Sequence, residues 1–110
     1  MDLKLGAVII DAASLEEESV FWHRLLGGSV ATTDTHHFLR AKGFPVLVIQ
    51  HAAGQVPPEW PDGTSQQMHL DVTADDLATA EKLALEAGAR RLSGHVYASP
   101  AGHPFCLRQA

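Results

Sequence analysis

The sequence has 110 residues, a length that suits one domain, because two independent cores would each bury too little surface to be stable. Hydrophobic residues make up 45% and charged residues 19% of the chain, which is typical of a folded globular protein and excludes a disordered one. The formal net charge of -5 disfavours a surface that binds nucleic acid.

Three further features bear on the location of the protein. The longest apolar runs, such as residues 46–49, span a few residues, whereas a membrane helix needs about 20. Residues 1–5 lack the basic and long apolar segments of a signal peptide. The single cysteine, Cys106, excludes an internal disulfide. We therefore expect a cytoplasmic protein that binds neither nucleic acid nor a membrane.

The chain begins with the pattern of a strand followed by a helix. Residues 5–10 form an apolar, β-branched run that is typical of a buried strand. Ser14 and Glu17 have the spacing of a capping box, which predicts a helix start. Apolar residues at helical spacing then predict a helix over residues 15–26, which ends at the glycine pair that starts with Gly27.

Three short strands and a long loop follow this helix. The strands are expected at residues 29–33, 38–41 and 45–51, separated by turn residues. Residues 52–66 are rich in proline and glycine, which neither a helix nor a sheet accommodates. This loop therefore divides the chain in half.

The second half repeats the order of elements in the first. Residues 68–72 alternate as a strand, and Thr73 is a candidate N-cap for the helix that follows. An apolar stripe over residues 77–87 predicts that helix, which ends at Gly88. Three further strands are expected at residues 91–93, 96–99 and 105–108.

The repeated order predicts an α+β fold. Two paired βαβββ modules would have curved sheets that form a shared cleft, with the helices outside, because each module alone is too small to bury a core. Residues 1–110 would form a single domain, with module one at about 1–52, a linking loop at about 53–66 and module two at about 67–110. A ferredoxin-like sandwich is the alternative, but it uses only four strands and leaves part of the C-terminal pattern unassigned. A ligand is expected in the cleft.

Four segments, read together, resemble a known family: residues 21–28 (FWHRLLGG), 69–72 (HLDV), 87–89 (AGA) and 99–107 (SPAGHPFCL). In this order and spacing, they resemble a glyoxalase-like domain of the vicinal oxygen chelate superfamily, which includes glyoxalase I, extradiol dioxygenases and bleomycin-resistance proteins. The resemblance covers nearly the whole chain. It implies paired βαβββ modules and commonly a homodimer.

The resemblance also implies where a metal would be held. Metal-dependent members take four ligands, drawn from His, Glu and sometimes Gln, from the first, fourth, fifth and eighth strands. Here the first-strand position falls within residues 6–8, which have no ligating side chain. The fourth-strand position is Val48 or Gln50, the fifth-strand position is His69, and Cys106 replaces the usual carboxylate on the last strand. No metal cofactor is therefore expected, and any metal would be held by His69 with Gln50 and Cys106.

The strand that contains His69 offers several interpretations. Alternation places Met68, Leu70 and Val72 on one apolar face and His69 with Asp71 on the other. His69 can be a core histidine satisfied by a neighbouring carbonyl or carboxylate, a ligand contact, or a metal ligand.

The remaining candidates also have a structural and a functional interpretation. Cys106 is interpreted first as a small buried hydrophobic residue and second as a ligand or nucleophile. Trp60, in the central loop, is either a plug over the core or a lid over a ligand or a partner subunit. His36 and His37 point to opposite faces of a strand, so they are expected to be surface residues.

These observations favour a small-molecule binding protein of the glyoxalase/bleomycin-resistance-like type without a complete metal site. The expected ligand is partly aromatic, and the candidate contacts are His69, Gln50, Trp60 and Cys106. The alternative is a divergent metal-dependent lyase, isomerase or dioxygenase of the same superfamily that uses His69. No catalytic residue is assigned, and a homodimer is expected because exposed strand edges and apolar surface need cover.

Overall fold

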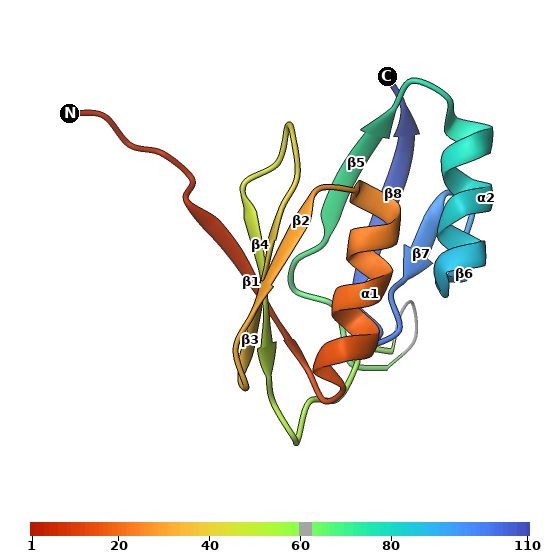
Figure 1. Ribbon diagram of the computed structural model, residues 1–110. Helices are drawn as coiled ribbons and strands as arrows, with labels where there is room; N and C mark the ends of the chain where they lie inside the picture. The colour runs from red at the N-terminus through yellow and green to blue at the C-terminus, as the bar shows by residue number, and fades with distance from the viewer. Residues whose placement is uncertain (60–62) are drawn as a thin grey trace. The chain divides into compact units, whose positions relative to one another are not determined.

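The computed structural model describes residues 1–59 and 63–110 (Figure 1). The chain divides into two compact units, Met1–Gln55 and Val56–Ala110. Each unit has the element order βαβββ and a four-stranded sheet. The prediction of an α+β fold built from two βαβββ modules is confirmed, whereas the shared cleft stays a prediction. None of the helices in the described ranges is long and apolar enough to cross a membrane.

The first unit contains β1 (Ala7–Ala12), α1 (Leu15–Leu26), β2 (Ser29–Thr32), β3 (His36–Arg40) and β4 (Val46–His51). The strand order is β1-β4-β3-β2, with β1 parallel to β4 and the other pairs antiparallel. The helix has the predicted bounds. Its N-cap, Ser14, accepts a hydrogen bond of 3.4 Å from the backbone N–H of Glu17, and Gly27 ends it with a φ of 74°.

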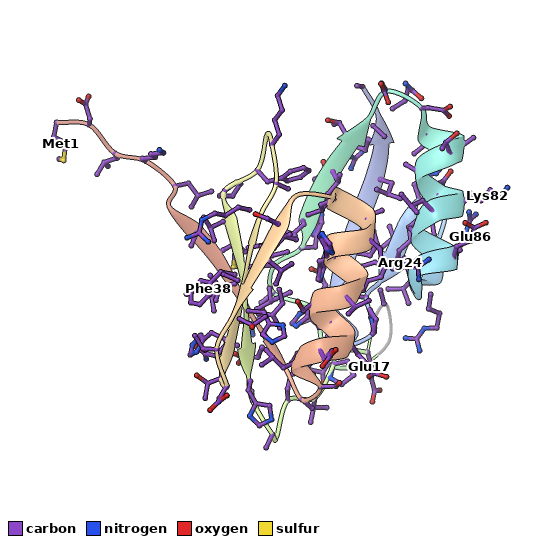
Figure 2. The ribbon with its side chains drawn as sticks, viewed as in Figure 1. Met1, Glu17, Arg24, Phe38, Lys82 and Glu86 are labelled. Carbon is purple, nitrogen blue, oxygen red and sulfur yellow. The ribbon has the colours of Figure 1, made fainter. Side chains whose placement is uncertain are left out.

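The helix α1 covers one face of the first sheet. It contacts β3 and β4, and its aromatic residues Phe21 and Trp22 are each 1% exposed. Leu39 of β3 and Ile49 of β4 are 1% and 0% exposed. Phe38 alternates with Leu39 and points to the side of the sheet away from α1 (Figure 2). The first unit therefore has its core on the helix side, and Phe38 lies on the opposite face of the sheet.

The second unit contains β5 (Leu70–Ala74), α2 (Leu77–Ala87), β6 (Arg90–Ser93), β7 (Val96–Ala98) and β8 (Pro104–Gln109). Its strand order is β5-β8-β7-β6, with β5 parallel to β8. Tyr97 and Phe105 are both 0% exposed, and their rings stack with centroids 5.8 Å apart. With Leu107 they form the centre of this core, which α2 covers through contacts to β5 and β8.

Two boundaries near β5 differ from the prediction. The strand begins at Leu70 instead of residue 68, so His69 lies outside it. Thr73 was the predicted N-cap of α2, and that prediction is wrong. Parallel pairing with β8 continues to Ala74 and keeps Thr73 in the strand. Asp76 caps the helix instead, because its carboxylate accepts hydrogen bonds from the N–H of Thr79 at 3.1 Å and from its hydroxyl at 2.8 Å.

Candidate functional site

Three polar side chains form a row across the face of the first sheet that α1 does not cover. The strand register pairs Asp11 of β1 with Gln50 of β4, and Gln50 with His36 of β3. Residues that are paired across neighbouring strands point to the same face of a sheet. We call these three residues the polar row.

Hydrogen bonds connect the polar row from end to end. The side-chain Nε2 of Gln50 donates to Oδ1 of Asp11 at 3.1 Å. The Oε1 of Gln50 lies 3.2 Å from Nε2 of His36, and Nδ1 of His36 lies 2.8 Å from the hydroxyl of Thr35. Because the amide oxygen can only accept, His36 donates from Nε2, and in the neutral imidazole Nδ1 then accepts from Thr35.

An apolar row lies next to the polar row on the same face. The register pairs Ile9 of β1 with Val48 of β4, and Val48 with Phe38 of β3. Ile9 is 60% exposed, Val48 is 5% exposed and Phe38 is half-buried. The ring of His36 stacks on that of Phe38, with centroids 6.1 Å apart and planes inclined by 20°. The face thus combines apolar side chains, of which Ile9 is largely exposed and Val48 is buried, with hydrogen-bonding groups along one edge.

The sequence-based candidates lie in different places. Gln50 belongs to the polar row, and Val48, the other fourth-strand candidate, lies on the same face. In the second unit, His69 is exposed and precedes β5, and Cys106 is half-buried in β8. Trp60 lies outside the described residues.

The register places Asp71, not His69, beside Cys106. Both oxygens of the Asp71 carboxylate accept from Nε of Arg108 at 2.8 Å. This hydrogen bond, with the negative charge of the carboxylate, raises the pKa of Arg108 above its ordinary value. The polar group next to Cys106 is therefore engaged with an arginine of the same sheet.

Two members of the polar row, Asp11 and His36, are missing from the sequence-based candidates. His36 and His37 are expected at the surface, and both are half-buried. Their alternation was predicted correctly, but the cross-strand register that brings Gln50 beside His36 joins residues 14 positions apart. The weak sequence signal for Asp11 is its place at the end of an apolar run.

The donor set does not fit the metal site that the resemblance implies. The first-strand position that the resemblance implies, within residues 6–8, has no ligating side chain, and Asp11, the β1 residue beside Gln50, already accepts from the Gln50 amide. The Oε1 of Gln50, the fourth-strand candidate on this face, is a neutral amide oxygen and already accepts from His36. Over residues 1–59 and 63–110, no group of three or more His, Cys, Asp or Glu side chains is placed to hold a metal ion.

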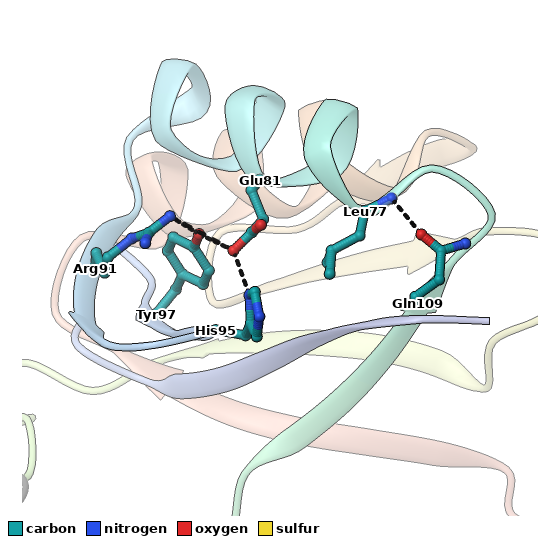
Figure 3. A network of polar contacts seen from close by, with 6 residues as sticks. All are labelled: Leu77, Glu81, Arg91, His95, Tyr97 and Gln109. Carbon is teal, nitrogen blue, oxygen red and sulfur yellow. Dashed lines mark hydrogen bonds and ion pairs between the residues drawn. The ribbon is translucent and has the colours of Figure 1, made fainter.

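A second polar cluster lies between α2 and the β6–β7 hairpin (Figure 3). The Oε2 of Glu81 accepts from the hydroxyl of Tyr97 at 2.5 Å and lies 2.9 Å from Nδ1 of His95. Arg91 donates from Nη2 to the same hydroxyl at 2.7 Å, and this nitrogen lies 3.5 Å from Glu81. These bonds join groups within the cluster, so its evident role is to fasten α2 to the sheet.

The cluster shifts the pKa values of two of its members. The hydrogen bond from Tyr97, followed by that from His95, lowers the pKa of Glu81 below its ordinary value. Burial first, and the hydrogen bond to Glu81 second, raise the pKa of Tyr97. Both shifts keep the carboxylate charged and the phenol neutral near pH 7, as the fastening requires.

Several solved structures resemble this fold. A glyoxalase/bleomycin resistance protein/dioxygenase family enzyme from Burkholderia phytofirmans PsJN matches with a TM-score of 0.75 and 14% identity, over 97% of this chain and 98% of that one. A glyoxalase/bleomycin resistance protein from Albidiferax ferrireducens T118 matches with a TM-score of 0.74 and 14% identity, over 96% and 97% of the two chains. A glyoxalase/dioxygenase from Nostoc punctiforme has the same TM-score and identity, over 96% of this chain and 90% of that one. At this identity the likeness concerns the fold alone.

The sequence itself identifies the family. The search among curated proteins gave no match. A family model described as a glyoxalase-like domain, however, matches residues 7–108, which include both helices and all of the described strands except the last residue of β8. The protein therefore belongs to the glyoxalase-like domain family of the vicinal oxygen chelate superfamily.

Proposed function

We propose that the protein binds a small planar molecule against the first sheet, on the face that carries the polar row, and that it does so without a resident metal. The observation that carries this proposal is the register of three strands, β1, β4 and β3. It aligns Asp11, Gln50 and His36 directly beside Ile9, Val48 and Phe38.

The two rows supply complementary kinds of interaction. An aromatic ring system can lie against Ile9, which is 60% exposed, and stack near Phe38, which is half-buried and already stacks with His36. The hydrogen-bonding edge of the same molecule can then reach the polar row. Small-molecule sites commonly combine apolar walls with a few placed polar groups in this way.

The alternative, a divergent metal-dependent lyase, isomerase or dioxygenase, has weaker support. It needs about three protein ligands around His69. His69 is exposed, and its side chain belongs to no metal-binding group within the described ranges. The name glyoxalase/bleomycin resistance protein, given to the Albidiferax ferrireducens relative, is compatible with a binding role as well as with an enzymatic one.

The sequence-based candidates of the second unit remain part of the proposal as possible ligand contacts. His69 is exposed, so a ligand can reach its ring from solvent. Cys106 is half-buried, so its thiol is partly accessible. Truncating His69 to alanine should weaken ligand binding by about 1 to 3 kcal/mol if its ring hydrogen-bonds the ligand. Unchanged affinity in His69→Ala would confine the site to the first unit.

A homodimer is the second part of the proposal, and a cytoplasmic location the third. Leu3 and Leu5 are 87% and 68% exposed, and β1 and β2 form the edges of the first sheet. A second copy of the chain can cover such apolar side chains and strand edges. Light scattering at micromolar concentration should give about twice the chain mass of 11.8 kDa, and the double variant Leu3→Asp, Leu5→Asp should lower it. A strict monomer would contradict this part of the proposal.

Calorimetric titration with a panel of planar bicyclic heteroaromatic compounds tests the binding function. We expect at least one compound to bind and His36→Ala to weaken that binding by about tenfold, because the variant removes both the ring stacked on Phe38 and the donor to Gln50. His51→Ala is the matched control, because His51 follows Gln50 in β4 and alternation points it to the other face. Equal losses in the two variants would contradict the proposed site.

A further inference from the structure

We infer that the polar row selects one chemical class of ligand, a planar compound with a lactam or primary carboxamide edge, and that the side chain of Gln50 reads this edge. A lactam or carboxamide edge presents one hydrogen-bond donor beside one acceptor. The inference rests on the proposed function and specifies the ligand of the same site.

The orientation of the Gln50 amide is fixed by its two neighbours. An ionised carboxylate has only acceptors, so Asp11 requires the amide nitrogen on its side, where Nε2 donates at 3.1 Å. The amide oxygen then faces β3, where Nε2 of His36 donates to it at 3.2 Å. If the amide were flipped, its oxygen would face the carboxylate of Asp11, where neither group can donate. Its nitrogen would then face Nε2 of His36, which would have to be unprotonated to accept.

A hydrogen bond with Thr35 fixes the tautomer of His36. Its Nδ1 lies 2.8 Å from the hydroxyl of Thr35, which can donate to it. The hydrogen bonds of the row therefore run in one direction, from Thr35 through His36 and Gln50 to Asp11. Asp11 and His36 act as positioning residues for the amide of Gln50.

The hydrogen bonds within the polar row use only half of the hydrogen-bonding capacity of the Gln50 amide. A glutamine side chain has two N–H donors and two acceptor lone pairs on its oxygen. The row engages one N–H and one lone pair of Gln50. One donor and one acceptor remain on a half-buried side chain next to the apolar row. A ligand edge with one acceptor and one donor satisfies both, whereas a carboxylate edge offers two acceptors and is repelled by Asp11.

The matched probes 2-quinolone and N-methyl-2-quinolone test this selection. They share the same planar ring system and carbonyl acceptor, but the methyl group removes the N–H donor of the lactam. We expect 2-quinolone to bind the full chain about fivefold to tenfold more tightly than the N-methyl compound, the usual effect of one hydrogen bond. Nuclear magnetic resonance titrations would give both affinities, with the side-chain N–H signals of Gln50 as the local reporter.

Two variants distinguish recognition of the lactam edge by Gln50 from contact with the planar ring system alone. Gln50→Leu removes the amide oxygen that would accept from the lactam N–H, so the preference for 2-quinolone should fall to less than about twofold. Asp11→Asn removes the fixed acceptor, permits a flipped amide and should reduce the preference part of the way. His51→Ala should leave the preference unchanged, and the thermal unfolding curve of each variant would establish that it folds.

Each outcome of these titrations decides something. A preference in the wild-type protein that is lost in Gln50→Leu supports the inference. Equal binding of the two probes, with His36→Ala still weakening both, would overturn the selection and leave the proposed binding function standing. A preference that survives in Gln50→Leu would place the recognition elsewhere. Binding of neither probe, nor of any compound in the heteroaromatic panel, would contradict both the inference and the proposed function.

Discussion

The hydroxyl of Tyr97 donates a hydrogen bond of 2.5 Å to Oε2 of Glu81, which joins the centre of the second sheet to the helix that covers it. Tyr97 is 0% exposed, and the side chain of Glu81 is 14% exposed. His95 adds a bond of 2.9 Å to the same oxygen. Because the carboxylate accepts these bonds as an anion, its protonation weakens the attachment of α2.

This relationship predicts an acid-dependent loss of stability. The pKa of Glu81 is lower in the folded protein than its ordinary value of 4.5, so folding favours the ionised form. The stabilisation is complete above the pKa of the unfolded chain and is lost as the pH falls through the lower pKa of the folded state. Wild type should therefore have a higher melting temperature than Glu81→Gln near pH 7, and the difference should shrink below pH 4.5.

Thermal melts from pH 7 down to pH 3 would measure this difference. Glu16→Gln is a suitable control, because Glu16 is an exposed glutamate on α1 and should show a smaller difference at every pH. A gap between wild type and Glu81→Gln that stays constant over the whole range would show that the charge of Glu81 does not stabilise the fold.

The glycine pair after α1 predicts two substitutions of different severity. Gly27 has a φ of 74° and a ψ of -155°, and a methyl group there would meet no atom within 4 Å. Gly28 has a φ of 85°, and a methyl group there would lie 2.1 Å from the carbonyl oxygen of Arg40. Gly27→Ala should lower the free energy of unfolding by about 1 to 3 kcal/mol from backbone strain alone. Gly28→Ala should lower it further, because the start of β2 must move away from the end of β3.

Urea denaturation of the two glycine variants tests this order. Each serves as the control for the other, since both lie at the same helix end with positive φ. Equal destabilisation of Gly27→Ala and Gly28→Ala would mean that the chain relaxes at Gly28 without strain on the sheet.

The helix α1 carries a buried polar pair whose loss should be measurable. Nε1 of Trp22 donates to Oε2 of Glu18 at 2.9 Å, and the two residues are 1% and 0% exposed. Trp22→Phe removes this donor from a buried carboxyl group and should lower the free energy of unfolding by about 1 to 3 kcal/mol. Phe44→Leu, at a 39% exposed position, should change it by less than about 0.5 kcal/mol. Similar values for the two variants in urea denaturation would contradict a stabilising role of the pair.

The donor set predicts that the dialysed protein contains no stoichiometric divalent metal. The reason is chemical: the first-strand position has no ligating side chain, and the described residues hold no group of three His, Cys, Asp or Glu side chains that could bind a metal. Elemental analysis of the purified protein measures this directly. About one zinc, nickel, iron or manganese ion per chain, lost in His69→Ala, would overturn the prediction and favour the metal-dependent alternative.

Local signals in the sequence were sufficient for the helices. Ser14 and Gly27 bracket α1, and Gly88 ends α2, because caps and glycine stops act within a few residues of the positions they define. The N-cap of α2 was mispredicted because two nearby residues, Thr73 and Asp76, can both cap a helix. Only the pairing of β5 with β8 keeps Thr73 in the strand.

The polar row could not be predicted in the same way. One of its hydrogen bonds joins Gln50 and Asp11, which are 39 positions apart in the sequence. This bond depends on the parallel register of β1 and β4. Alternation correctly separated His36 from His37, but it gives no information about the neighbouring strand. Gln50 became a candidate through the family resemblance, as a weak metal ligand, and the structure places it between two polar partners instead.

The most direct measurement of the central claim is a map of backbone and side-chain amide shifts as 2-quinolone is added to isotope-labelled protein. We expect the largest changes on the side-chain amide of Gln50 and on the backbone amides of Ile9, Asp11, His36 and Phe38, and we expect His36→Ala to reduce them strongly. Shifts confined to the second unit, or equal in size in wild type and His36→Ala, would contradict the claim that the polar row and the apolar row form a binding site.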